Sequence, residues 1–204
     1  MSIYEYNGSA LIAMAGKECV AIASDTRFGV RNQTVWREAQ KIFQINNKTF
    51  LGLGGLNTDI WTLKETFRFH HNLYALREER DMSPKVFANL VSHVLYSHRF
   101  GPYFVSPIVC GLDDDNVPFL CGTDEIGAQE ITHDFIATGT AVESLMGVCE
   151  TFYKENLEPE DLFETISQCL LAGVDRDCLS GWGAVVHVLT KDGITTRKLK
   201  MRQD

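Results

Sequence analysis

The stretch GSALIAMAGKECVAIASDTR, residues 8–27, carries the clearest structural signal in the chain. It contains two short apolar runs, residues 10–15 and 19–24, with Gly16-Lys17-Glu18 between them. Short apolar runs separated by a few turn-forming residues are typical of two strands joined as a β-hairpin. The stretch therefore predicts a pair of antiparallel strands near the start of the chain.

The same signals recur along the chain. Residues 41–45 and 49–53 flank Asn46-Asn47-Lys48, and asparagine tolerates the left-handed backbone of a tight turn. Helices are predicted over residues 57–80, from Ser83-Pro84 to Gly101-Pro102, over 141–153 and from 158 onward; strands are predicted over 107–112, 118–121, 135–137, 184–190 and 194–199.

This order of elements predicts the fold class. Strand pairs alternate with pairs of helices, and a hairpin closes the chain. Such an order favours antiparallel sheet with helices packed in layers over an alternating parallel fold. No internal repeat or long linker is present, so residues 1–204 are predicted to form one domain.

The composition excludes several classes of protein. Hydrophobic residues make up 45% of the 204 residues and charged residues 23%, which is enough apolar surface for a sizeable core. The formal net charge of −8, without a basic run, argues against binding to nucleic acid or to an anionic membrane. No apolar run approaches the ~20 residues of a membrane-spanning helix, and the start of the chain lacks the basic region of a signal peptide.

The cysteines and histidines do not predict a disulfide scaffold or a metal site. The six cysteines are scattered without a C-x-x-C pair, so we expect reduced thiols in a cytosolic or nuclear protein. His70 and His71 are adjacent, and His93 and His98 are five residues apart, so neither pair shares a helical face. Residues 53–56, LGGL, could hold an anion or allow close helix–strand packing. No metal or cofactor is expected.

Ser9, Asp25 and Lys41 form the most informative spacing. The ends of adjacent strands can converge, so Asp25 and Lys41 could form an ion pair beside the Ser9 hydroxyl. A lysine that a carboxylate holds next to a hydroxyl would favour the alkoxide and so activate a nucleophile. Asp–Lys pairs at strand ends are also common as purely structural contacts, and spacing alone favours that interpretation.

Gly8-Ser9, residues 19–27 and Lys41 together resemble the opening of the proteasome beta-subunit family. The resemblance covers essentially the whole chain. It implies an α+β fold, the four-layer α/β/β/α sandwich of N-terminal-nucleophile hydrolases. This agrees with the element order read from the sequence.

The resemblance also implies a set of site residues. In catalytic members the residue at the Ser9 position is the N-terminal threonine nucleophile. Gly55 falls on the oxyanion-hole glycine of the family, and Thr140 on a serine near the nucleophile. Asp177 and Ser180 fall on the supporting aspartate and serine.

Within the family, residues 72–80, 99–104 and 156–167 are most similar to beta-3-type subunits. That class implies a non-catalytic, structural subunit of the 20S core beta ring, which supports ATP- and ubiquitin-dependent protein degradation. It also implies a hetero-oligomeric double ring with other beta and alpha subunits, in cytoplasm and nucleus.

Ser9 decides whether the chain is expected to be an enzyme. Catalytic members use the free α-amine of the first residue as the base, whereas Ser9 follows eight other residues. The constellation is therefore predicted to be vestigial. Beta-3-type members often carry glycine at this position, so the hydroxyl of Ser9 keeps a self-processed N-terminal-serine peptidase as the alternative. A homomeric protease of the bacterial type is disfavoured, because it needs a catalytic N-terminus on every subunit.

Asp124 is the last candidate. It falls where family members present an acidic side chain toward the adjacent catalytic subunit, which would favour basic substrates there. On the sequence alone, a solvated turn over Thr123-Asp124-Glu125 is equally compatible.

Overall fold

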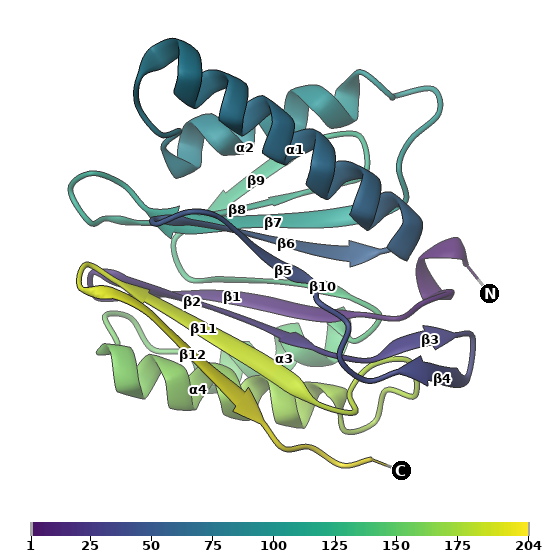
Figure 1. The fold of residues 1–204 in the computed structure, drawn as a ribbon. Coiled ribbons are helices and arrows are strands. Elements are labelled where there is room, and N and C mark those ends of the chain that lie inside the picture. The colour runs from purple at the N-terminus through teal and green to yellow at the C-terminus, as the bar shows by residue number, and fades with distance from the viewer. Residues whose placement is uncertain (1, 204) are drawn as a thin grey trace.

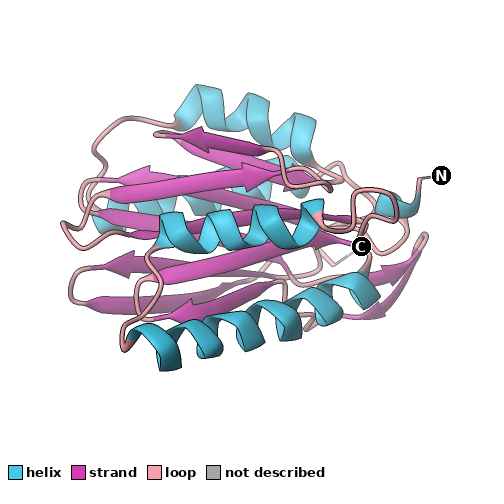
Figure 2. Cartoon of the chain, turned by 90° about the horizontal axis from the view of Figure 1, so that it is seen from above, coloured by secondary structure: helices cyan, strands magenta, loops and turns pink. Residues whose placement is uncertain are grey.

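Two five-stranded sheets stack face to face, and a pair of helices covers the outer face of each (Figure 1). The computed structural model describes residues 2–203. The strand order is β10-β1-β2-β11-β12 in the first sheet and β5-β6-β7-β8-β9 in the second. Every pairing in these two sheets is antiparallel. Figure 2 shows that the helices run broadly along the strands.

The bounds of the elements follow the predicted runs closely. The first sheet and its helices comprise β1 (Ala10–Gly16), β2 (Cys19–Asp25), β10 (Phe135–Gly139), α3 (Val142–Phe152), α4 (Pro159–Val174), β11 (Ala184–Thr190) and β12 (Gly193–Leu199). The second sheet and its helices comprise β5 (Ile42–Asn46), β6 (Thr49–Gly55), α1 (Asn57–Glu78), α2 (Pro84–Tyr96), β7 (Val105–Leu112), β8 (Pro118–Thr123) and β9 (Gln129–Thr132).

Three apolar cores hold the four layers together. One lies between the first sheet and α3/α4, one between the second sheet and α1/α2, and one between the two sheets. Strand β1 contributes to two of them: Ile12 and Met14 face the helices, whereas Leu11 and Ala13 face the other sheet. Because side chains alternate across a strand, a strand covered on both faces must be apolar throughout. This is why residues 10–15 form a continuous apolar run, and the α/β/β/α sandwich is confirmed.

Some elements were not predicted from the sequence. The hairpin β3 (Phe28–Val30) and β4 (Gln33–Trp36) forms a separate two-stranded sheet, and β9 extends the second sheet. A short 3₁₀ helix, η1 (Ile3–Glu5), precedes β1. Helix η1 and strands β4 and β9 are short and largely exposed, and β3 has only three residues, so these segments lack the apolar periodicity on which strand prediction depends.

Helix α2 ends earlier than the sequence predicts. Its last residue is Tyr96, not the residue before Gly101-Pro102. The Ser97 hydroxyl donates to the Val94 carbonyl, and the chain continues to Gly101 as hydrogen-bonded turns. The N-terminus is as predicted, because Ser83 caps the helix and Pro84 occupies its first turn.

The topology brings several strand ends to one end of the sandwich. Ala10 at the start of β1 lies opposite Asp25 at the end of β2 and Gly139 at the end of β10. Ala184 at the start of β11 also pairs with Asp25. The N-terminus, the β3–β4 hairpin and the C-terminus all lie at this end (Figure 1).

Across residues 2–203, the structure contains no helix with the length and apolar character needed to span a bilayer. All six cysteines are free thiols, and five of them are buried. The exposed one is Cys178, which follows α4.

His187 makes the stability of the sandwich dependent on pH. Its ring stacks on Phe50 of the opposite sheet, with the centroids 5.2 Å apart, and its Nδ1 lies 2.8 Å from Thr196 Oγ1. Burial lowers the pKa of His187 from 6.5. His187 therefore binds a proton more readily in the unfolded chain than in the folded chain, so the free energy of unfolding should fall as the pH drops below about 6.5.

Urea unfolding of the purified chain at about pH 7.5 and about pH 5.5 measures this difference in the free energy of unfolding. His187→Gln should reduce it, and His133→Gln, at an exposed position, should not; equal effects of the two variants would contradict the assignment.

Candidate functional site

The Asp25 carboxylate is the centre of the predicted site. It is fully buried and accepts hydrogen bonds from four segments of the chain. Oδ1 accepts from the Lys41 ammonium at 2.6 Å and from the Ala10 amide at 2.8 Å. Oδ2 accepts from the amides of Gly181 at 3.1 Å and Arg27 at 3.3 Å. The predicted Asp25–Lys41 ion pair is therefore present, and both side chains are shielded from solvent.

Lys41 is directed toward the backbone before Ser9. Its Nζ also donates to the Gly8 carbonyl at 3.2 Å. Burial lowers the pKa of Lys41, while the charge of Asp25 and its hydrogen bond oppose that shift. The buried ammonium of Lys41 therefore has a counter-ion, the Asp25 carboxylate, and a second hydrogen-bond acceptor, the Gly8 carbonyl.

The Ser9 hydroxyl is buried without a partner. Ser9 is 1% exposed, and among residues 2–203 its Oγ has no hydrogen-bond partner. Lys41 and Asp25 therefore lie close to the Ser9 backbone without bonding its hydroxyl. The predicted trio is brought together, but the contact that would activate a nucleophile is not formed in this structure.

Asp177 gathers the remaining polar residues of the predicted set. Its Oδ2 accepts from the hydroxyl groups of Ser180 at 2.6 Å and Thr140 at 2.7 Å, and its Oδ1 accepts from the Leu179 amide at 3.0 Å. The Thr140 amide in turn donates to the Ser9 carbonyl at 2.7 Å. Thr140, Asp177 and Ser180 thus form a network that fixes the Ser9 backbone.

The two glycines of LGGL serve close packing. A Cβ on Gly54 would lie 2.9 Å from Ser9 Oγ, and Gly55, with φ of +118°, lies against the Phe104 carbonyl. A side chain at either position would displace its neighbours or strain the backbone. Close packing between β6 and its surroundings therefore accounts for both glycines, and no feature here supports the anion-binding interpretation.

The N-terminal segment, residues 2–8, forms one wall of the cavity above Ser9. The cavity has a volume of about 400 Å³ and is lined by Ser9, Gly55 and Thr140 together with Ser2, Tyr4 and Glu5 of this segment.

Sequence reasoning missed Arg27 and Asn7. The Arg27 side chain is fully buried, and its guanidinium donates to the Leu179 carbonyl at 2.8 Å and to the Arg31 carbonyl at 3.1 Å. The Asn7 side chain bonds both to Gly29 in β3 and to the start of α1. A charged residue directly after a buried strand was a usable signal for Arg27, whereas Asn7 belongs to no recognisable pattern.

Asp124 lies apart from this network, in the turn between β8 and β9. The residue is exposed, and its Oδ1 accepts from the amides of Ile126 at 3.0 Å and Ala128 at 2.7 Å. It also lines a cavity of about 370 Å³ together with Ser106 and Thr138. The Asp124 carboxylate therefore stabilises its own turn while the residue remains exposed to solvent.

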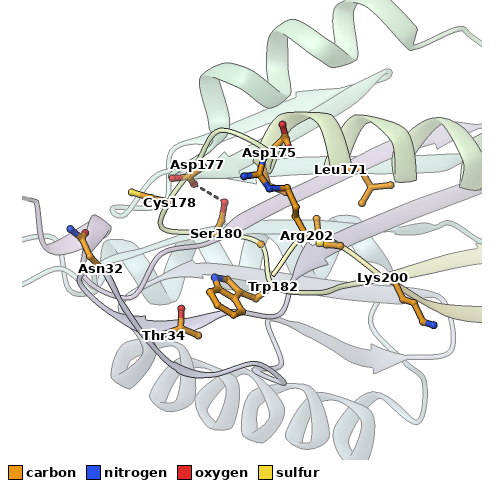
Figure 3. Close-up of a pocket in the computed structure, with 13 residues that line it drawn as sticks. Asn32, Thr34, Leu171, Asp175, Asp177, Cys178, Ser180, Trp182, Lys200 and Arg202 are labelled. Carbon is orange, nitrogen blue, oxygen red and sulfur yellow. Dashed lines mark hydrogen bonds and ion pairs between the residues drawn. The ribbon is translucent and has the colours of Figure 1, made fainter. Parts of the chain in front are cut away.

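A third cavity, of about 460 Å³, lies beside the segment that follows α4 (Figure 3). Figure 3 shows the Asp177–Ser180 hydrogen bond on one side and Trp182, Lys200 and Arg202 on the other. Its lining mixes acidic and basic side chains. In the part of the chain that the structure describes, no group of three or more His, Cys, Asp or Glu side chains could hold a metal ion.

Comparison with known proteins gives a consistent result. The family model described as "Proteasome subunit" matches residues 5–189. Proteasome subunit beta type-3 of Picea mariana is 57% identical over 204 residues, and that of Dictyostelium discoideum is 56% identical over 205; each alignment covers 100% of both chains. The Drosophila melanogaster protein of the same name is 50% identical, again over the full length of both chains.

Removing the charge of Asp25 should strongly destabilise the fold. Asp25→Asn leaves the buried Lys41 ammonium without its counter-ion, and breaking a buried ion pair in this way costs about 3–5 kcal/mol of unfolding free energy. Chemical denaturation followed by circular dichroism measures the loss. The double variant Asp25→Asn/Lys41→Met, which removes both charges, should be less destabilised than the sum of the single variants. Additive losses would show that the two charges do not interact.

Proposed function

This chain belongs to the proteasome subunit family, and we propose that it takes one position in a heteromeric beta ring of the 20S core. It assembles with other proteasome subunits and is a structural subunit that does not itself cleave peptides. The likeness to beta type-3 subunits over the full length of the chain supports this assignment.

The environment of Ser9 is the main observation in favour of a subunit that does not catalyse peptide cleavage. A nucleophile of the N-terminal type needs a free α-amine as its base. The nitrogen of Ser9 is instead a peptide amide, whose lone pair is delocalised into the Gly8 carbonyl. The buried hydroxyl has no hydrogen-bond partner among residues 2–203, and Ser2, Tyr4 and Glu5 line the cavity in front of it. The alternative, an N-terminal-serine peptidase, has no support in these contacts.

The polar constellation around Ser9 has a structural use. Asp25 joins four segments, and Asp177 joins Thr140, Ser180 and Leu179. Buried polar networks that are fully matched hold a fold in one arrangement. The presence of these residues therefore does not require that they take part in a reaction.

We further propose the wider setting of the subunit. The beta ring would be paired with a second beta ring and capped by alpha rings, and the particle would act in ATP- and ubiquitin-dependent protein degradation in the cytoplasm and nucleus. The net charge of −8 and the free thiols fit such a setting.

Asp124 is proposed to line the substrate pocket of a neighbouring catalytic subunit. Its exposure in the turn between β8 and β9 makes the carboxylate available to a partner, while Oδ1 keeps the turn closed. A negative charge at the edge of a pocket would attract basic substrate side chains.

The proposed assembly is tested by recovery of the chain in its native state. Size-exclusion chromatography of a native extract, followed by mass spectrometry, should find the chain in a particle far heavier than 22.9 kDa together with other proteasome subunits. Recovery only as a free monomer would refute the proposal.

Ser9→Ala should leave every peptidase activity of the particle unchanged. Because the Ser9 hydroxyl has no partner among the described residues, its removal should not lower the free energy of unfolding either. Ser180→Ala is the matched control: it breaks the bond to Asp177 and should cost about 1–2 kcal/mol. An N-terminus at Ser9 in the assembled particle, or labelling of Ser9 by a hydroxyl-directed inhibitor, would contradict the non-catalytic assignment.

Asp124→Asn should selectively weaken cleavage after basic residues. The amide oxygen can still accept the two turn hydrogen bonds, so the change removes charge rather than shape. We expect kcat/KM for basic substrates to fall about three- to tenfold, chiefly through KM, and the effect to shrink as salt rises. Cleavage after apolar residues should stay level. Asp115→Asn, in the exposed turn between β7 and β8, is the control; if it matches Asp124→Asn, the pocket assignment is wrong.

A further inference from the structure

The N-terminal segment, residues 2–8, is fixed at three consecutive positions by buried or backbone groups. The Tyr6 carbonyl accepts from the Arg31 amide at 2.8 Å, and the Asn7 carbonyl accepts from the Gly29 amide at 3.2 Å. The Gly8 carbonyl accepts from Lys41 Nζ at 3.2 Å. The segment therefore runs beside β3 as an additional backbone-bonded piece of structure.

Asn7 connects two elements that are otherwise separate. Its Nδ2 donates to the Gly29 carbonyl of β3 at 2.8 Å, and its Oδ1 accepts from the Asn57 amide at 2.9 Å. Asn57 is the first residue of α1, and the residue at the N-cap, Leu56, makes no side-chain cap bond. Because the first amides of a helix lack partners within the helix, Asn7 supplies from a distance the oxygen that a capping residue normally provides.

Two buried cations also depend on the N-terminal segment. Arg27 lies within 3.5 Å of the Asn7 carbonyl, and Lys41 donates to the next carbonyl, that of Gly8. Both residues are buried, with exposed fractions of 0% for Arg27 and 5% for Lys41. Without these carbonyls, each cation would lose an acceptor in a site where water cannot readily replace it.

Apolar packing alone does not hold the segment in place. Within residues 2–8 only Asn7 and Gly8 are buried, whereas Ile3 and Tyr6 are exposed by 41% and 38%. Gly8, with φ of +74°, lies so close to the Leu179 carbonyl that no side chain fits there. The attachment therefore rests mainly on the polar contacts of Tyr6, Asn7 and Gly8 and on the close passage of Gly8, with one edge-to-face ring contact between Tyr4 and Phe104.

We propose that the N-terminal segment is a structural strap, with Asn7 as its clasp, that ties the start of helix α1 to the β3–β4 hairpin. The proposal goes beyond the absence of a catalytic base, because a subunit could be non-catalytic with a loose N-terminal segment.

Hydrogen–deuterium exchange on the assembled particle tests the strap. Asn7→Ala should speed exchange about ten- to a hundredfold at two places, the Asn57 amide with the first turn of α1 and the amides of residues 28–36, because each loses a buried hydrogen bond. Ile3→Ala, an exposed position in the same segment, is the control and should leave both regions as in the wild type.

A second variant separates the two bonds of the clasp. Asn7→Asp keeps an acceptor for the Asn57 amide, which a carboxylate at a helix N-terminus satisfies well, but it loses the donor to Gly29. It should loosen residues 28–36 while the first turn of α1 stays protected. This variant also decides the matter if Asn7→Ala fails to assemble.

Unchanged exchange in both regions for Asn7→Ala, in a particle of normal composition, would overturn the strap. So would equal loosening by Ile3→Ala. Either result would leave the proposed function intact, since that depends on assembly with other proteasome subunits. Hydrogen–deuterium exchange therefore tests the strap, whereas the subunit composition of the particle tests the proposed function.

Discussion

The buried carboxylate of Asp25 is the group on which one whole end of the molecule depends. A charge taken out of water is tolerated only where donors surround it, and Asp25 meets Lys41 and the amides of Ala10, Arg27 and Gly181. These donors come from β1, from the segments after β2 and α4, and from the residue before β5. The carboxylate thereby fixes the relative positions of segments that lie up to 156 residues apart.

The same constellation can serve either catalysis or architecture, and the N-terminal residues decide which. A lysine, two aspartates and two hydroxyl residues around a strand end would support a nucleophile only if its own α-amine were free. Here Lys41 is directed to the Gly8 carbonyl, and the Asp177 network fixes the Ser9 backbone. The arrangement fixes the backbone around a hydroxyl that takes no part in catalysis, as expected of a structural subunit.

How well the sequence predicted the fold varied with the burial of each element. The runs at residues 10–15 and 19–24 were predicted within a residue or so, because strands covered on both faces are apolar almost throughout. The run at residues 184–190, which contains His187, was predicted equally well because a clear turn separates it from the last strand. The hairpin β3–β4 and strand β9 were missed, because β3 has only three residues and the largely exposed side chains of β4 and β9 follow no apolar period. The start of helix α2 was predicted correctly, because the Ser83 cap is a local sequence signal. Its end at Tyr96 was not, because the hydrogen bond from the Ser97 hydroxyl to the Val94 carbonyl cannot be read from the spacing of apolar residues.

For the site, the family resemblance read from the sequence predicted that one group of polar residues belongs together, namely Ser9, Asp25, Lys41, Thr140, Asp177 and Ser180. The meeting of antiparallel strand ends made the Asp25–Lys41 pair predictable. The packing of distant segments was needed to show that the Ser9 hydroxyl has no partner among residues 2–203, that Arg27 is fully buried, and that Asn7 reaches the start of α1. Those facts depend on contacts between segments such as Asn7 and Asn57, 50 residues apart. Local patterns encode burial and turns, whereas a hydrogen bond between distant segments is fixed only when the packed cores place both partners within reach.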